Sequence, residues 1–187
     1  FLLLPIARKT RDDPLPMRHY SLRDNICNFL FVGRLNRDEA YKGVDEILEV
    51  LASNVRLRQH SFVTFVGTGD DIERLRSKAS MLSLDRNVKF MGRVSDEQLH
   101  QIYIASDVFL MPSENEGFGV VFLEAMGHGL PCIGGNTGGT PYVLENNVSG
   151  LLVSRKNKKQ LSTAMWTLVS EEKARARLGT VARARVE

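Results

Sequence analysis

Short apolar runs alternate with segments of helical periodicity along most of this chain. The runs have the length of β-strands, and the segments between them carry apolar residues at intervals of three and four. The apolar runs are residues 25–32, 61–66, 88–91, 108–111, 132–134 and 150–153. At least five alternations of this kind predict an α/β fold, a doubly wound parallel sheet of about six strands with helices on both faces. Sheets of this type bind ligands at the carboxyl ends of their strands.

Local signals predict where several helices begin. Ser95 and Gln98 have the spacing of a capping box, Asp70 is placed to cap the helix after the second strand, and Pro141 suits the first turn of a short helix. The charged segment 36–42 is expected to be a loop that leads into a helix from residue 44. Residues from Lys158 onward are expected to be helical almost to the end of the chain.

Composition describes an ordinary globular domain. The 187 residues suffice for one domain, and the apolar fraction of 43% suffices for one core. The net charge of +3 is compatible with anionic ligands without requiring them. Cys27 and Cys132 lie in apolar runs and are expected to be buried thiols. The pattern contains no metal-ligand cluster, no membrane-length apolar run and no aromatic-interleaved basic motif for nucleic acid.

The first 25 residues differ from the rest. Pro5, Pro14 and Pro16 interrupt a segment dense in charge. We therefore expect residues 1–25 to be a linker or a truncated remnant of a preceding region, and residues 26–187 to form the domain. The tail from Glu171 is basic and helix-forming. It is expected to be a solvated helix face, and the alternative is a helix lying on anionic lipid.

Two carboxylates mark the segment between the fourth and fifth predicted strands. Glu116 lies in a Gly-containing loop and Glu124 in the helix that follows, which is apolar on nearly all sides and is expected to be buried. A carboxylate in such a helix needs a partner. Glu124 either pairs with an Arg or a backbone amide to hold the core, or accepts hydrogen bonds from ligand hydroxyls such as those of a ribose. The glycines at 117 and 119 form either a plain turn or a phosphate-binding helix start.

Two cations follow the first predicted strand. Arg34 and Lys42 lie in the strand-to-helix connection, where a pair of cations can face a phosphate. The alternative is that both are ordinary solvated loop charges, and spacing alone favours that alternative.

The segment EGFGVVFLEAMGHGLP resembles the signature of the family 4 retaining glycosyltransferases, enzymes of the GT-B fold. Their hallmark is a Glu, seven residues and a second Glu, which here are Glu116 and Glu124. The resemblance extends over about residues 29–153. It implies that residues 26–187 form a Rossmann-like, nucleotide-sugar-binding domain, the C-terminal half of a GT-B fold.

The resemblance also implies roles for individual residues. FLFVGRLNRDEAYKGVD is similar to the family's phosphate-gripping element, so Arg34 and Lys42 would bind the donor diphosphate and support catalysis. Glu116 would be catalytic beside the donor sugar, and Glu124 would bind the ribose. The remaining donor-binding residues implied are Val94 near the base, Gly117, Phe118 and Gly119 at sugar or phosphate, and the glycine loop Gly138, Gly139 and Thr140.

Two departures from the family pattern concern these elements. The interval from Arg34 to Lys42 is about three residues longer than the commonest form, so the loop is expected to bulge. Tyr142 stands where many members have Glu after the proline of the glycine loop.

The activity implied is transfer of a sugar, retaining and without a metal or other cofactor, from a UDP-, GDP- or ADP-sugar to an acceptor. The acceptor, a glycan or a lipid-linked molecule, would be held by an N-terminal domain absent from this chain, so the chain alone is expected to bind nucleotide without transferring sugar. Cytoplasmic location, with peripheral contact at the inner membrane face, is the matching expectation, with no nucleic-acid partner. The alternatives are a non-catalytic nucleotide-sugar-binding module and, less favoured by the signature, a GT-B epimerase or another Rossmann-like nucleotide enzyme.

Overall fold

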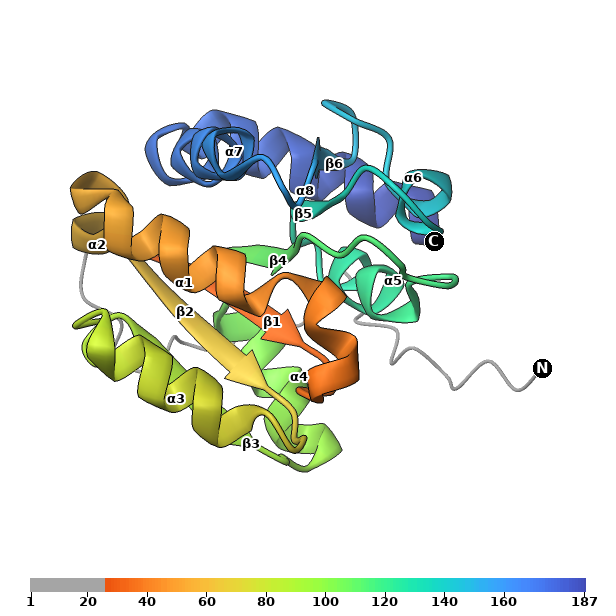
Figure 1. Cartoon of the computed structure of the whole chain (residues 1–187). Helices are drawn as coiled ribbons and strands as arrows, with labels where there is room; N and C mark the ends of the chain where they lie inside the picture. The colour runs from red at the N-terminus through yellow and green to blue at the C-terminus, as the bar shows by residue number, and fades with distance from the viewer. Residues whose placement is uncertain (1–25) are drawn as a thin grey trace.

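A six-stranded, all-parallel sheet forms the centre of the molecule (Figure 1). The computed structural model describes residues 26–187, so the predicted linker, 1–25, lies outside the described residues. The strand order is β3-β2-β1-β4-β5-β6. The strands are β1 Cys27–Val32, β2 Ser61–Val66, β3 Val88–Gly92, β4 Val108–Met111, β5 Cys132–Gly135 and β6 Gly150–Val153. All six predicted strands are therefore confirmed, and the sequence order reverses direction between β1 and β4.

Helices cover both faces of this sheet, as the alternating pattern predicts. On one face α1 packs against α3 and α7, and α2 also contacts α7. On the other face α5 packs against α8, and α4 lies beside α5. The helices are η1 Arg37–Lys42, α1 Val44–Ser53, α2 Val55–His60, α3 Ile72–Met81, α4 Asp96–Ala105, α5 Val120–Gly127, α6 Thr140–Val143, α7 Lys158–Ser170 and α8 Glu172–Val186.

The structure confirms two of the predicted helix starts and corrects a third. The Ser95 hydroxyl accepts from the Gln98 amide at 3.2 Å while the Gln98 side chain accepts from the Ser95 amide at 2.9 Å, and Pro141 lies in the first turn of α6. The assignment of Asp70 as a helix cap is wrong. Asp71 precedes α3, and the Asp70 carboxylate instead accepts from the Arg37 amide at 2.9 Å.

The C-terminal region consists of two helices instead of one. Glu171 separates α7 from α8 with non-helical torsion angles, φ −113° and ψ 83°. Helix α8 buries Leu178, Gly179 and Ala182, so one side of the tail belongs to the core and the prediction of a solvated helix holds for its outer side alone. Two of the basic side chains on that side pair with carboxylates, Arg183 with Glu187 and Arg185 with Glu145.

Both cysteines are buried thiols, as predicted. Burial raises the pKa of the Cys27 thiol to about 12, and burial also raises the pKa of Cys132. Neither thiol is therefore ionised near neutral pH, which makes both poor nucleophiles in the folded chain.

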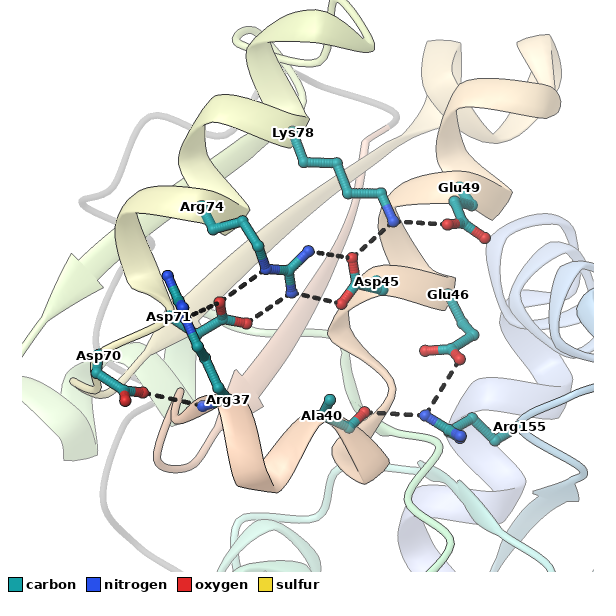
Figure 2. Close-up of polar contacts among 10 residues, drawn as sticks. All are labelled: Arg37, Ala40, Asp45, Glu46, Glu49, Asp70, Asp71, Arg74, Lys78 and Arg155. Carbon is teal, nitrogen blue, oxygen red and sulfur yellow. Dashed lines mark hydrogen bonds and ion pairs between the residues drawn. The ribbon is translucent and has the colours of Figure 1, made fainter.

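Ion pairs join α1 to α3 on one face of the sheet (Figure 2). Arg74 donates to both carboxylate oxygens of Asp45, at 2.9 and 2.7 Å, and Lys78 donates to the same carboxylate at 2.6 Å. Arg74 also pairs with Asp71, and Lys78 with Glu49. Hydrogen bonds from Arg74, with those from Lys78, lower the pKa of Asp45 to about 2.

This depressed pKa predicts a specific loss of stability in acid. A carboxylate whose pKa is lower in the folded chain stabilises the fold above its ordinary value of 3.8, and that contribution is lost as the pH falls toward 2. Between pH 5 and pH 3 we expect the unfolding free energy of the wild type to fall by about 1 kcal/mol more than that of Asp45→Asn. Urea unfolding at the two pH values measures this difference. Glu73→Gln, which removes an exposed pair with Arg76, is the control and should retain the wild-type slope.

Candidate functional site

The connections that leave the carboxyl ends of the strands are joined to one another by backbone hydrogen bonds. The amide of Gly33, after β1, donates to Val66 at 3.0 Å, and the amide of Gly67, after β2, donates to Gly92 at 2.9 Å. A Cβ built on Gly67 would lie 1.9 Å from the Gly33 carbonyl oxygen, so this approach needs glycine. The sequence pattern, which places glycine at the end of these strands, therefore produces a continuous, closely packed edge.

The loops that carry most of the predicted site residues are joined in the same way. The amide of Glu114, after β4, donates to the Tyr41 carbonyl of η1 at 3.0 Å. The amide of Gly139, after β5, donates to the Glu116 carbonyl at 2.7 Å. The structure thus brings the connections after β1, β4 and β5 into one contiguous surface on one edge of the sheet.

Arg155 stabilises this surface through contacts with η1, α1 and the segment after β4. The sequence analysis did not identify it. It follows β6, and its guanidinium donates to the Ala40 carbonyl at 3.0 Å and pairs with Glu46 at 3.2 Å and Glu114 at 3.0 Å. Figure 2 shows the contacts with Ala40 and Glu46. A single Arg after a short strand gives no sequence signal, because its partners come from segments more than forty positions away along the chain.

Lys42 is buried, which contradicts its interpretation as a solvated loop charge. The segment 36–42, predicted as a loop, contains the short helix η1, which kinks at Glu39. The Lys42 ammonium points back along the chain, 3.4 Å from the Arg34 carbonyl oxygen, and a Cβ built on Gly33 would lie 3.5 Å from it. The short helix η1 therefore returns Lys42 to the end of β1.

Arg34 and Lys42 converge on one carboxylate that the sequence analysis did not single out. Glu39 Oε1 accepts from Arg34 at 2.7 Å and from Lys42 at 3.2 Å. The Glu39 side chain is 6% exposed and that of Arg34 is 75% exposed. The available signal was a carboxylate between two cations at helical spacing, since Glu39 precedes Lys42 by three positions. Arg34 and Lys42 thus share one carboxylate oxygen as a partner.

Glu124 accepts a hydrogen bond from a tyrosine hydroxyl, a protein partner that the sequence did not indicate. The hydroxyl of Tyr103, from α4, donates to Glu124 Oε2 at 3.1 Å. Burial, with the neighbouring Glu124 charge, raises the pKa of Tyr103, so the phenol stays protonated and acts as the donor. The Tyr103 ring stacks on His128 with ring centroids 4.6 Å apart. Helices α4 and α5 therefore hold the carboxylate in place through one hydroxyl, and Glu124 itself is half-buried.

The Glu116 loop presents both polar and apolar groups. The Ser113 hydroxyl donates to Glu116 Oε1 at 3.2 Å, and Ser113 itself is fully buried. Phe118 is 66% exposed and Val120 59% exposed. The expectation that the apolar helix α5 is buried is therefore wrong at its start, where Val120 is exposed.

The glycine loop lies directly against the Glu116 loop. Gly138 has φ +67°, and a Cβ there would lie 2.9 Å from the Glu116 carbonyl oxygen. A Cβ on Gly139 would lie 1.4 Å from the Gly117 carbonyl oxygen. Thr140 is buried with a hydroxyl that has no hydrogen-bond partner, and Tyr142 is 83% exposed. Val94 follows β3, and strands β2 and β1 lie between β3 and β4 in the sheet. Val94 is therefore at a distance from the Glu116 loop and the glycine loop, which follow β4 and β5.

Two absences apply to the described part of the chain. Within residues 26–187, no group of three or more His, Cys, Asp or Glu side chains is arranged to hold a metal ion. Over the same residues, no helix is both long and apolar enough to cross a lipid bilayer.

The sequence matches the family described as glycosyl transferases group 1 over residues 22–185. It is 34% identical over 159 residues to D-inositol 3-phosphate glycosyltransferase of Corynebacterium jeikeium, covering 81% of this chain and 37% of that protein. It is 31% identical over 180 residues to a GDP-mannose-dependent alpha-(1-6)-phosphatidylinositol monomannoside mannosyltransferase of Mycobacterium tuberculosis, covering 92% and 47%. The chain therefore spans less than half the length of these relatives.

Solved structures agree with this assignment. Alr3699/HepE of Anabaena, in complex with UDP and glucose, superposes with a TM-score of 0.77 at 25% identity, over 87% of this chain and 44% of that one. The C-terminal domain of the group 1 glycosyl transferase LpcC of Francisella tularensis has the same fold, with a TM-score of 0.75 at 24% identity over 86% and 84%. The chain belongs to the glycosyl transferase group 1 family, and its residues 26–187 have the fold of a GT-B C-terminal domain.

Proposed function

We propose that this chain is the donor-binding domain of a retaining, metal-independent glycosyltransferase that uses a nucleoside diphosphate sugar. Arg34 and Lys42 bind the diphosphate, Glu124 binds the ribose hydroxyls, and Glu116 lies beside the donor sugar. The amides of Gly117, Phe118 and Gly119 and the loop Gly138, Gly139 and Thr140 complete the phosphate and sugar contacts, and Val94 contacts the base through its backbone. The nucleotide complex of HepE supports a uridine nucleotide as the first ligand to test.

One observation carries this proposal, namely that the connections after β1, β4 and β5 form one surface through hydrogen bonds of 3.0 and 2.7 Å. The groups assigned to that surface are the cations Arg34 and Lys42, the amino end of α5, and the carboxylates of Glu116 and Glu124. Cleavage of a nucleotide sugar leaves a diphosphate whose negative charge must be stabilised. Arg, Lys and the positive end of a helix can supply that stabilisation without a metal ion.

The acceptor side of the reaction belongs to another domain in this proposal. The relatives are more than twice as long as the matched segment. We therefore expect the 187-residue chain to bind donor nucleotides and to need an acceptor-binding domain for transfer. Detectable transfer by this chain to any acceptor other than water would contradict that part of the proposal.

Calorimetric titration of the folded chain with UDP, GDP and ADP tests the function directly. We expect saturable binding of at least one of the three and no requirement for a divalent cation. If a folded sample binds none of them, in the presence or absence of Mg²⁺, the donor-binding assignment fails and the chain is an interaction module with a glycosyltransferase fold. The same panel identifies the base. The side chains do not indicate it, because the proposed contacts with the base are made by the backbone.

Glu124→Gln distinguishes a ribose ligand from a structural carboxylate. The amide keeps the size of the side chain and can still accept from Tyr103, but it is a weaker acceptor for two ribose hydroxyls. We expect about a tenfold loss in affinity for the nucleotide that binds best, and a change below twofold for inorganic pyrophosphate, which has no ribose. Calorimetry with both ligands provides the comparison. An equal loss for the two would show that Glu124 acts through the fold.

A further inference from the structure

The carboxylate of Glu39 pairs with both Arg34 and Lys42, the two cations assigned to the donor diphosphate. Its Oε1 accepts from Arg34 at 2.7 Å and from Lys42 at 3.2 Å, and its Oε2 accepts from the side-chain amide of Asn36 at 3.2 Å. The same residues line a small cleft together with Asp71. Two oxygens with three donors around them form the arrangement in which proteins bind phosphate oxygens.

Burial makes this arrangement an energetic necessity for the chain without ligand. The side chains of Glu39 and Lys42 are 6% and 10% exposed. A buried carboxylate is strongly destabilising unless it is paired and hydrogen-bonded, and the same holds for a buried ammonium. Each of these two groups therefore compensates the charge of the other, and the exposed Arg34 adds a second cation beside Glu39.

We propose that Glu39 is an internal counter-ion that occupies the Arg34–Lys42 pair when no donor is bound and gives up Arg34 to the donor diphosphate. This inference rests on the proposed function of the two cations. Because the Arg34 side chain is 75% exposed, it can rotate from the carboxylate to a phosphate oxygen without any change in the core. Lys42 stays between Glu39 and the incoming phosphate. Glu39 therefore competes with the ligand, lowers its affinity and favours release of the nucleoside diphosphate product.

The segment between Arg34 and Lys42 places Glu39 beside both cations. It contains η1, which kinks at Glu39, with φ −104° and ψ 19°, and the Glu39 side chain is buried. Its neighbour Asp38 is exposed. Asp38 has the same charge on the same helical turn, so it separates the effect of a nearby negative charge from the effect of direct competition.

Calorimetric titration with inorganic pyrophosphate at one salt concentration tests the proposal on the 187-residue chain. Glu39→Gln removes the charge while preserving the shape of the side chain. We expect it to bind pyrophosphate about tenfold more tightly than the wild type, equivalent to about 1.4 kcal/mol. Asp38→Asn should stay within about twofold of the wild type, because the solvent-exposed Asp38 charge is screened and contacts neither cation.

A second variant and a second readout keep the test decisive. Glu39→Asp keeps the charge but shortens the reach to Arg34, so it should tighten binding by about threefold, and it is available if Glu39→Gln does not fold. In thermal melts, the ligand-free Glu39→Gln chain should melt below the wild type and gain more from pyrophosphate. A purely structural role would lower the melting temperature without tightening the binding.

The outcomes distinguish this inference from the proposed function. If the wild type binds pyrophosphate and Glu39→Gln binds it equally or more weakly, Glu39 does not compete and the inference is overturned while the diphosphate site stands. If the wild type binds neither pyrophosphate nor any nucleoside diphosphate, both are overturned. Tighter binding by Asp38→Asn equal to that of Glu39→Gln would reduce the effect to general electrostatics and also reject the competition.

Discussion

Lys42→Ala is expected to weaken diphosphate binding by about 1.5–3 kcal/mol, the range for a hydrogen bond to a charged group. This corresponds to an affinity loss of roughly 10- to 150-fold. The ammonium is buried, lies at the end of β1 and is held by Glu39 at 3.2 Å, so its position is fixed before the ligand arrives. A preorganised charge of this kind loses little entropy on binding. Calorimetry with inorganic pyrophosphate and with the nucleotide that binds best measures the loss.

The control for this variant is Lys173→Ala. Lys173 is exposed on α8 near the end of α7, which reaches the start of β1 at the opposite edge of the sheet. Lys173→Ala removes the same charge from the chain as Lys42→Ala, but at a position away from the proposed site. Equal losses in the two variants would assign the effect to net charge. Unchanged binding in Lys42→Ala, in a sample that still shows a cooperative melt, would mean that Lys42 does not contact the diphosphate.

The sheet could be predicted from the sequence because each strand is a short apolar run bounded by glycine or charge. All six runs are strands, and the capping box at Ser95 fixes the start of α4. The errors occur where a local signal competes with a distant partner. Asp70 has the residue type of a helix cap, yet it accepts from Arg37, thirty-three positions earlier in the chain. The break at Glu171 has no strong sequence marker, because both flanking segments are good helix formers.

The candidate site was predicted less completely than the fold. The family resemblance, and not their spacing alone, assigns Arg34 and Lys42 to the site, and in the structure both contact Glu39. Spacing does not reveal the residues that hold them, because Glu39 resembles any surface carboxylate and Arg155 any surface cation until the tertiary contacts are known. Tyr103 is similar, since nothing in the sequence of α4 indicates that its hydroxyl meets Glu124 of α5. Supporting side chains depend on three-dimensional packing more than motif residues do.

Gly139→Ala is expected to lower the unfolding free energy by about 3 kcal/mol or more, the upper end of the range for overpacking. The backbone of Gly139, φ −79° and ψ −19°, suits any residue, so the effect is steric. A Cβ there would lie 1.4 Å from the Gly117 carbonyl oxygen and 3.0 Å from that of Glu116. Both obstacles are backbone atoms, which cannot rotate away as a side chain can.

The two loops must therefore separate, and the 2.7 Å hydrogen bond from the Gly139 amide to Glu116 must break. If the two loops separate locally and the domain stays folded, the unfolding free energy falls by less than about 3 kcal/mol. Nucleotide affinity then also falls, because the Glu116 loop moves away from the diphosphate. Urea unfolding and UDP calorimetry together separate these two results.

Gly117→Ala is the matched control for stability, since a Cβ there meets nothing within 4 Å and Gly117 is exposed. It should change the unfolding free energy by no more than about 0.5 kcal/mol. Equal stability of the two variants would show that the glycine loop does not press against the Glu116 loop.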